Sequence, residues 1–292
     1  MTISVEKLQP FGARVRGVDL ANPLDDELFD RIRDAFNAHA VLVFPGQPLD
    51  DEQQIAFSLR FGPLETSIRK DRKRRVTRPE ISEIANVDEH GRIVDADDER
   101  AIYNAGNQLW HSDSSFKRVP AMASLLSARE LPPEGGETEF ADLRAAWDAL
   151  PEAKRRGLEG LVAEHNFVYS RSLIGYDQFT DAERAAVPPV QQALVRTHPV
   201  TGRKALFLGS HASHIIGWPV EEGPTLLREL LEFATQPRFV YRHTWRVLDL
   251  VMWDNRCVLH RGRPWDQTRH RRVMHRTTVA GDGPTAADGR PL

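Results

Sequence analysis

Two histidines and one aspartate are the residues of this chain whose types and spacing are most suggestive of chemistry. His111 and Asp113 stand two positions apart within residues 107–116, NQLWHSDSSF. Side chains of a β-strand alternate between faces, so this spacing directs an imidazole and a carboxylate to one side. His260, at the end of the mostly apolar residues 252–260, is the best candidate for a third ligand. Two histidines and a carboxylate that leave coordination positions open are the ligand set of non-haem Fe(II) oxygenases.

The His-x-Asp motif is weak by itself, because the chain contains 11 histidines and a histidine on a strand is often only structural. A structural role for His111 therefore stays open at this point. A second pair, His211 and His214, has a spacing that suits a helix better than the strands expected around it. Packing or pocket lining is favoured there over a second metal site.

Two arginines near the end of the chain strengthen the chemical interpretation. Arg272 and Arg276 are four residues apart, so on a strand they would share a face, roughly 13 Å from each other. A charged side chain that points into a β core requires a partner, because an unpaired buried charge is very costly. The planar guanidinium group matches a carboxylate bidentately, which favours an anionic ligand such as a dicarboxylate whose near end binds metal.

The elements that must position these residues are short strands, with helices mainly in the first half. Residues 25–39 have apolar side chains at helical spacing, and residues 50–62 begin with the capping-box pair Asp50 and Gln53. Residues 95–100 are expected to form an exposed charged loop. Further helices are expected at residues 142–149, after 151, at 180–186 and at 224–234, and strands at 3–5, 13–20, 40–44, 81–87, 121–128, 193–197, 204–208, 239–245, 247–253, 257–260 and 272–279. This pattern predicts a mainly β, α+β fold, with a double-stranded β-helix (jelly-roll) core flanked by helices.

Composition limits the class of protein. A formal net charge of -3 argues against a general nucleic-acid-binding role. The single cysteine, Cys257, cannot form an internal disulfide. The first residues lack the apolar segment of a signal peptide, and no run of about 18 apolar residues could span a bilayer. We therefore expect a cytoplasmic protein without a nucleic-acid or membrane partner.

Residues 67–78, SIRKDRKRRVTR, form a basic cluster within this acidic chain. A solvated loop is the favoured interpretation of such a short charge run. A lid that attracts an anionic substrate is the alternative.

Several segments, taken in order, carry a resemblance to a known family. They are Trp110-His111-Ser112-Asp113, Gly135-Gly136-Glu137-Thr138, Met252-Trp253-Asp254-Asn255-Arg256, His260 and Arg271-Arg272-Val273-Met274-His275-Arg276. Together they resemble the Fe(II)/2-oxoglutarate-dependent dioxygenases of the taurine and 2,4-dichlorophenoxyacetate (2,4-D) family. Residues 107–116, 211–214 and 239–243 are more similar to its 2,4-D members. The similarity covers nearly the whole chain and implies a single dioxygenase domain over residues 1–292.

The resemblance implies a role for several residues. It implies that His111, Asp113 and His260 are the iron ligands. It implies that Thr138 and Arg272 bind the distal carboxylate of 2-oxoglutarate, with Arg272 chosen over Arg271 from the Arg-Arg-x-x-x-Arg pattern. The substrate-binding residues that it implies are Asn107, Arg276, which could also contact the metal-bound carboxylate, and Arg69 or Lys70 in the basic cluster. Trp253 is expected to be a wall of the iron pocket or a core aromatic residue.

The resemblance also implies the reaction. Fe(II), 2-oxoglutarate and O2 would hydroxylate an anionic small molecule, with succinate and CO2 as coproducts. For an aryloxyalkanoate such as 2,4-D, hydroxylation beside the ether oxygen would give a phenol and glyoxylate. Another carboxylate, or a sulfonate such as taurine, is the alternative substrate, and the enantiomer preference stays open. A zinc hydrolase and a non-catalytic jelly-roll binding protein are the alternative classes, and relatives suggest assembly as a homo-oligomer.

Overall fold

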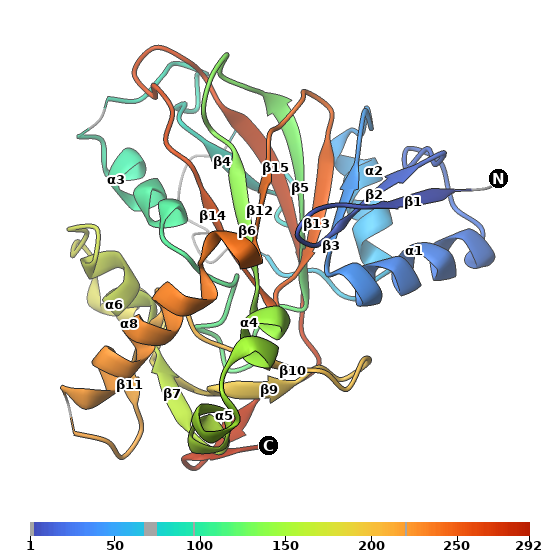
Figure 1. Ribbon diagram of the computed structural model, residues 1–292. Helices are drawn as coiled ribbons and strands as arrows, with labels where there is room; N and C mark the ends of the chain where they lie inside the picture. The colour runs from blue at the N-terminus through green and yellow to red at the C-terminus, as the bar shows by residue number, and fades with distance from the viewer. Residues whose placement is uncertain (1–2, 67–74, 96, 220) are drawn as a thin grey trace.

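The computed structural model describes residues 3–66, 75–95, 97–219 and 221–292, which form both helices and strands (Figure 1). The helices are α1 (Asp26–His39), α2 (Asp51–Leu59), α3 (Glu99–Ala105), α4 (Leu143–Ala149), α5 (Glu152–Leu158), α6 (Phe167–Ser172), α7 (Asp181–Ala186) and α8 (Glu222–Ala234), with 3-10 turns η1 (Gly106–Gln108) and η2 (Pro237–Phe239). The strands are β1 (Ser4–Lys7), β2 (Ala13–Arg16), β3 (Val41–Phe44), β4 (Ser82–Ala85), β5 (Ala123–Glu130), β6 (Thr138–Asp142), β7 (Val162–His165), β8 (Val190–Ala193), β9 (Val195–Thr197), β10 (Lys204–Leu206), β11 (Ala212–Ile215), β12 (Val240–His243), β13 (Leu250–Asp254), β14 (Val258–Gly262), β15 (Val273–Val279), β16 (Ala286–Ala287) and β17 (Arg290–Pro291). The chain thus combines sheets with helices, as its sequence predicts.

Two sheets enclose the region that holds the predicted site. The larger sheet of the described residues has seven strands in the order β1-β2-β3-β13-β5-β15-β4. The sheet β12-β6-β14 packs against it, and the rings of Phe140 on β6 and Trp253 on β13 lie 5.5 Å apart. Helices α1 and α2 lie against the other face of the large sheet (Figure 1). Shorter sheets, β11-β7-β8, β10-β9 and β16-β17, complete the described chain.

Strand β13 shows how one sequence serves both layers. Leu250 and Met252 pack with apolar residues of α1, whereas Val251 and Trp253 pack in the layer that contains the small sheet. This alternation is the period of two expected for a strand that is buried on both faces. The large sheet is therefore a wall between the helices and the predicted site.

The two predicted arginines lie along this wall: Arg272 immediately precedes β15, and Arg276 lies within it. Met274 belongs to the same layer as the small sheet. Arg272 and Arg276 lie two residues before and after Met274, so both point toward the small sheet. His275 points the other way, and its Nδ1 lies 2.6 Å from Asp51 on α2.

Local signals account for the elements that sequence analysis located. Asp25 caps α1, where its carboxylate accepts a hydrogen bond from the Leu28 N–H at 2.8 Å. Asp50 and Gln53 form the predicted capping box of α2. The predictions for α4, α5, α7, α8, β3, β5, β9, β10 and β12 to β15 are also confirmed, with shifted ends.

Two local predictions are wrong. Residues 95–100 are not a loop throughout, because α3 begins at Glu99 and continues into η1. Residues 107–116 do not form a strand: His111 makes an isolated bridge, and Asp113 begins a turn in which Ser114 has a φ of 55°. A turn, rather than strand alternation, therefore brings Asp113 to the same side as His111.

Candidate active site

The backbones of His111 and His260 pair with each other. The His111 N–H donates to the His260 carbonyl at 3.0 Å, and the His260 N–H donates to the His111 carbonyl at 2.8 Å. Directly paired residues of antiparallel chains project to the same side, and the two imidazole rings lie 4.1 Å apart. Two segments that are distant in sequence are thus fixed as neighbours by their own backbones.

Asp113 completes a compact group of candidate ligands. Its carboxylate oxygens lie 3.9 Å from His111 Nε2 and 3.7 Å from His260 Nε2. One ligand atom from each of these residues lies within 4.8 Å of the others, and all three residues are buried. The two nitrogen–oxygen distances are too long for hydrogen bonds, whereas a shared metal ion would bridge all three atoms. The donor set fits a divalent transition metal.

Protonation states in this group also suit a metal. The Leu109 carbonyl lies 2.7 Å from His111 Nδ1, so Nδ1 donates and the lone pair of Nε2 faces Asp113. Burial lowers the pKa of the His111 and His260 side chains, so that both are neutral. Burial is the largest influence on Asp113 and opposes its ionisation, but Arg276 and smaller contributions from neighbouring side chains together hold the pKa of this carboxyl below its usual range. Neutral imidazoles with a carboxylate are the form that binds metal.

Residues that sequence analysis missed hold Asp113 in place. Ser124 on β5 donates to Asp113 Oδ2 at 2.6 Å, and Asn255 Nδ2 donates to Ser124 Oγ at 3.0 Å. The Asn255 Oδ1 accepts from the Asp113 N–H at 3.1 Å and from Trp253 Nε1 at 3.0 Å. Asn255 follows Trp253 within the segment that carries the family resemblance, but Ser124 lies in an apolar run without a signal.

Trp253 serves both functions considered for it. It is 1% exposed, and its ring lies 4.5 Å from that of His260. It is therefore a core aromatic residue and also a wall of the candidate metal group.

The two predicted arginines have different surroundings. Arg276 donates to Asp113 Oδ1 at 2.6 Å, and its buried Nε has no hydrogen-bond partner in the described residues. Arg272 donates through Nε to the Gly136 carbonyl at 3.1 Å, and burial alone lowers its pKa to about 10, since no described carboxylate offsets it. A buried cation of this kind requires an anionic ligand. The neighbouring Arg271 is exposed and pairs with Glu130 at 2.8 Å.

Thr138 begins β6, two residues after Gly136, whose carbonyl accepts the hydrogen bond from Arg272. It is buried, its Oγ1 accepts a hydrogen bond from Trp245 Nε1 at 3.0 Å, and it follows the turn whose Gly136 contacts Arg272. Thr138 is also paired in register with Gly262 of β14, two residues after His260. The structure therefore brings Thr138, Arg272 and the metal group to one region.

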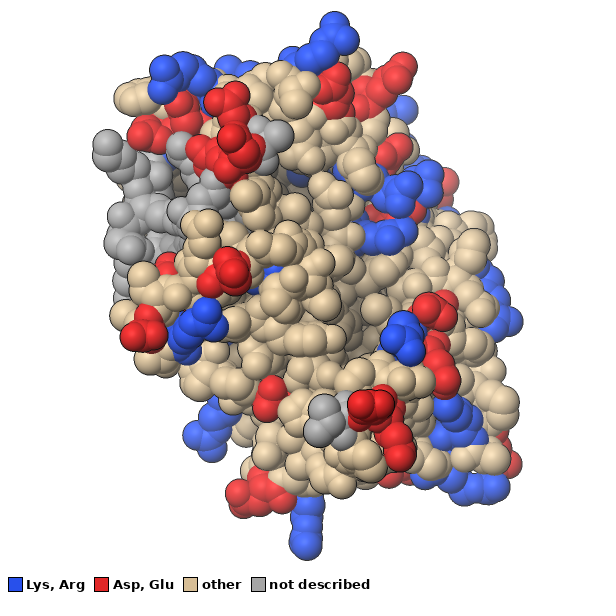
Figure 2. All heavy atoms as spheres, turned by 90° about the vertical axis from the view of Figure 1, so that its left-hand side faces the viewer, with Lys and Arg blue, Asp and Glu red and all other residues tan. Residues whose placement is uncertain are grey.

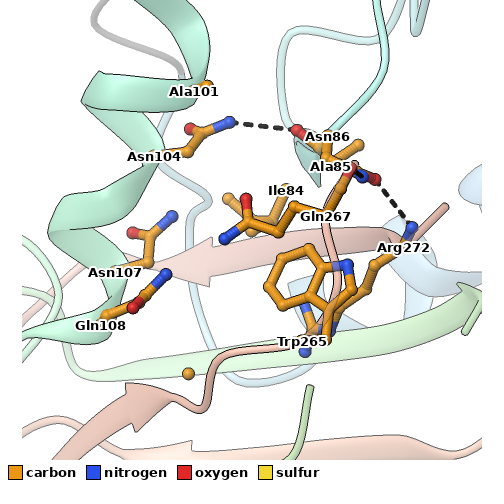
Figure 3. A pocket seen from close by; sticks show the side chains of 11 residues that line it. Ile84, Ala85, Asn86, Ala101, Asn104, Asn107, Gln108, Trp265, Gln267 and Arg272 are labelled. Carbon is orange, nitrogen blue, oxygen red and sulfur yellow. Dashed lines mark hydrogen bonds between the residues drawn. The ribbon is translucent and has the colours of Figure 1, made fainter. Parts of the chain in front are cut away.

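A pocket connects Arg272 with Asn107 (Figure 3). Asn107 and Gln108 line it from η1, and Trp265, Gln267 and Arg272 line the opposite side. On the face that carries α3 and α6, charged side chains lie mostly around the edge of a largely uncharged central area (Figure 2). Asn107 is thus placed beside the region of Arg272, whereas Arg69 and Lys70 fall outside the described residues.

His211 and His214 do not form a metal group in the described chain. The buried His211 ring lies 6.1 Å from that of His111 and packs against Phe116 and Phe167, and its Nδ1 lies 3.1 Å from Ser115 Oγ. His214 is partly exposed. His211 is a packing residue, as favoured from the sequence.

Similarity to known proteins identifies the family. The family model described as taurine catabolism dioxygenase TauD, TfdA family, matches residues 4–278. The chain belongs to this family. A relative from Burkholderia sp. (strain RASC), alpha-ketoglutarate-dependent 2,4-dichlorophenoxyacetate dioxygenase, is 50% identical over 282 residues, covering 96% of this chain and 95% of the relative. The (S)-phenoxypropionate/alpha-ketoglutarate-dioxygenase of Sphingobium herbicidovorans is 41% identical, covering 93% of this chain and 92% of the relative.

Solved structures agree with this TauD/TfdA membership. The crystal structure of AAD-2 in complex with Mn(II) and N-oxalylglycine has a TM-score of 0.91 and 46% identity, and covers 99% of this chain and 100% of that chain. A taurine dioxygenase from Burkholderia xenovorans has a TM-score of 0.78 at 30% identity, and covers 99% of this chain and 93% of that chain.

Family membership decides the class of enzyme. The protein is a 2-oxoglutarate-dependent dioxygenase that requires Fe(II) and O2 and acts on a small molecule. This outcome confirms the predicted class over the zinc hydrolase and the binding protein. No helix in the described part of the chain is long and apolar enough to cross a membrane. A cytoplasmic location, homo-oligomeric assembly and the lack of a nucleic-acid partner stay predictions.

Proposed function

We propose that this dioxygenase hydroxylates an aryloxyalkanoate such as 2,4-D, using iron held by His111, Asp113 and His260. The observation that carries the proposal is the convergence of these three ligand atoms in a chain that also buries Arg272 without a carboxylate partner among the described residues. Relatives named as 2,4-dichlorophenoxyacetate and (S)-phenoxypropionate dioxygenases, which match nearly the full length, support the substrate class.

The protein's part in the reaction is to hold the metal ion and to orient 2-oxoglutarate and the substrate. His111 and His260 offer neutral imidazoles, and Asp113 offers a carboxylate that Arg276 helps to keep ionised. When bound, Fe(II) and 2-oxoglutarate supply the oxidation, which consumes O2, releases succinate and CO2, and inserts one oxygen atom into a substrate C–H bond. For 2,4-D, the product hydroxylated beside the ether oxygen is a hemiacetal, which separates into the phenol and glyoxylate.

Arg272 and Arg276 would each bind a different anionic group. Arg272, with the Thr138 hydroxyl nearby, would hold the distal carboxylate of 2-oxoglutarate, because this buried guanidinium has no other described counterion. Arg276 already contacts Asp113 and retains an unpartnered buried Nε, so it would orient the metal-bound carboxylate or the substrate anion. Asn107, on the wall of the pocket in Figure 3, would contact the substrate.

Other features of the proposal rest on the resemblance. Arg69 or Lys70 would pair with the substrate carboxylate, as the matching segment of the 2,4-D enzymes suggests. The two packed sheets support a jelly-roll core, and the match over residues 4–278 supports a single dioxygenase domain. The aryl group, chain length and enantiomer of the substrate are the variables of the test.

Succinate formation tests the function directly. Protein loaded anaerobically with Fe(II) receives 2-oxoglutarate, and succinate is measured after oxygen is admitted, with 2,4-D, both phenoxypropionate enantiomers, taurine or no substrate. We expect stimulation by an aryloxyalkanoate, with phenol and succinate released in equal amounts. Stimulation by taurine alone would replace the aryloxyalkanoate with a sulfonate. Uncoupled turnover with no stimulation by any of these compounds would also reject the proposed substrate class.

A further inference from the structure

Residues 263–271, which follow β14 and lead to Arg272 just before β15, form a cover over Arg272. Trp265 in this segment places its ring 5.3 Å from the Arg272 guanidinium carbon, within the range of a cation–π contact. The Trp265 Nε1–H donates to the His270 carbonyl at 3.3 Å and so closes the segment on itself. We refer to residues 263–271 as the Trp265 loop.

One asparagine ties this loop to the sheet. Asn86 lies immediately after β4 and is 5% exposed as a whole residue. Its side chain makes three hydrogen bonds. Its Nδ2 donates to the carbonyls of Gln267 at 2.8 Å and His270 at 2.9 Å. Its Oδ1 accepts from the Arg272 N–H at 2.8 Å, a contact drawn in Figure 3. Both amide hydrogens and the amide oxygen are therefore used, and all three bonds hold one short stretch of backbone.

A second element confines the same guanidinium. Gly135 and Gly136 have positive φ values of 76° and 71°, and the turn that they form packs against the loop. A Cβ on Gly135 would lie 2.6 Å from the Pro264 carbonyl oxygen, and a Cβ on Gly136 would lie 3.1 Å from Arg272 Cδ. Arg272 is thus enclosed by a glycine turn, to which its Nε donates, and by the indole of the Trp265 loop.

We propose that Asn86 is a positioning residue for the 2-oxoglutarate site: by fastening the Trp265 loop to β4, it holds Arg272 ready for the distal carboxylate. The inference rests on the proposed function of Arg272. A flexible arginine loses side-chain freedom when it binds a carboxylate, and a preformed surrounding removes part of that cost. Within the described residues, the hydrogen bonds of the Asn86 amide all go to the Trp265 loop and to the Arg272 backbone, so its effect is directed to Arg272.

Asn104 provides a matched comparison on the other side of the pocket. Its Nδ2 donates to the Ala85 carbonyl at 3.0 Å, so it fastens α3 to the same strand end (Figure 3). Asn86 and Asn104 therefore make the same kind of side-chain-to-backbone bond near the end of β4: Asn86 donates to the Trp265 loop, and Asn104 donates from α3 to Ala85. Only the wall fastened by Asn86 contains Arg272.

The experiment compares Asn86→Ala, Asn104→Ala and Arg272→Met in protein loaded with Mn(II) without oxygen. The dissociation constants of Mn(II) and of 2-oxoglutarate are measured separately by titration calorimetry. We expect Asn86→Ala to weaken 2-oxoglutarate binding on the order of tenfold, as for other outer supports of a binding group. Mn(II) binding should change less than about twofold, and Asn104→Ala should leave both constants within this range.

Arg272→Met separates the inference from the function on which it rests. It should weaken 2-oxoglutarate binding on the order of a hundredfold, as expected for loss of a buried charge partner. If Arg272→Met binds 2-oxoglutarate normally, the proposed function of Arg272 is wrong. If Arg272→Met binds weakly while Asn86→Ala binds normally, the positioning role of Asn86 is wrong and that of Arg272 stands. Equal weakening in Asn86→Ala and Asn104→Ala would also reject a role specific to Asn86.

Hydrogen exchange in the unaltered protein gives a test that does not depend on a variant's folding. If the loop is held before the ligand arrives, the amide of Arg272 should be protected in the metal-loaded protein without 2-oxoglutarate. In Asn86→Ala, this amide should exchange faster, while amides of α1 keep their rates. Rapid exchange of the Arg272 amide in the unaltered protein, slowed only by 2-oxoglutarate, would show that the ligand orders the loop and overturn the inference.

Discussion

Two buried groups among the described residues have the composition of a metal site, but they differ in how their polar atoms are used. The first is His111, Asp113 and His260, and the second is His198, Asp254 and Cys257. Both place one potential ligand atom per residue within 4.8 Å of the others. Composition and proximity alone would assign a metal to each.

In the second group the ligand atoms are already engaged. His198 Nε2 donates to Asp254 at 2.9 Å, and His198 Nδ1 accepts from the N–H groups of Val200 at 3.3 Å and Thr201 at 3.2 Å. Asp254 also accepts two bonds from the Arg256 guanidinium, both at 2.8 Å. Burial raises the pKa of the Cys257 thiol, which keeps it protonated.

The first group leaves its nitrogens open toward a shared point. His111 and His260 direct Nε2 toward Asp113 at distances too long for hydrogen bonds. The difference lies in the imidazole nitrogens: a buried cluster fits a metal ion when these nitrogens face a carboxylate without hydrogen bonds, and it fits a structural network when each nitrogen is hydrogen-bonded. The following variants test this distinction.

The largest expected effect is loss of metal from the first group. In His260→Ala, Mn(II) binding should fall by more than about a hundredfold, because a direct ligand matters more than an outer partner. The unaltered protein should bind one equivalent of Mn(II) in a calorimetric titration, and His260→Ala should bind none at the same concentrations.

Cys257→Ala is the matched variant in the second group. It removes a buried candidate ligand of the other cluster and should leave the single equivalent of Mn(II) in place. A second equivalent in the unaltered protein that disappears in Cys257→Ala would show that the second group also binds metal.

The next effect is on folding stability. Asp254→Ala leaves Arg256 and His198 buried without their carboxylate, and breaking a buried ion pair costs about 3–5 kcal/mol. The free energy of unfolding, from urea titrations of the metal-free protein, should fall by this amount. The control is Asp282→Ala, which removes a carboxylate that is 54% exposed and 3.5 Å from the same arginine. It should cost less than about 1 kcal/mol, and equal losses in the two variants would contradict the structural role of Asp254.

Sequence alone predicts the parts of this molecule that depend on local signals. The apolar spacing of α1 and the capping box of α2 lie within one segment, so both elements were predictable. Helix α3 was missed because it has only 7 residues and begins within a charged run, and its place depends partly on the Asn104 contact with β4. A tertiary contact of this kind has no trace in the local pattern.

The candidate site divides in the same way. His111, Asp113, His260 and Arg272 were identified because the resemblance marks their segments, although the strand geometry expected for His111 and Asp113 was wrong. Ser124 and Asn86 could not be identified, because a serine in an apolar strand and an asparagine after a strand are common. Their importance comes from partners far away in the sequence, Asp113 and Arg272.

The smallest expected effect concerns pH and extends the comparison to single histidines. His165 is fully buried, and neither of its ring nitrogens has a hydrogen-bond partner in the described residues, whereas both nitrogens of His198 are bonded. Burial lowers the pKa of His165 to about 3, against about 6.5 in the unfolded chain. The native protein then binds fewer protons than the unfolded chain between these values. Stability is therefore complete above about pH 6.5 and is lost as the pH falls.

From pH 6.5 to pH 5, this one group should lower the free energy of unfolding by about 2 kcal/mol. Burial also lowers the pKa of His111, His211 and His260, so the effect of His165 is isolated by a difference. Urea titrations of metal-free protein and of His165→Leu at both pH values give that difference. On acidification, the free energy of unfolding of the variant should rise by about 2 kcal/mol relative to that of the unaltered protein, since leucine has no proton to bind. Parallel loss in both proteins would mean that His165 titrates normally when buried, and that an unpartnered imidazole in this core is not held neutral.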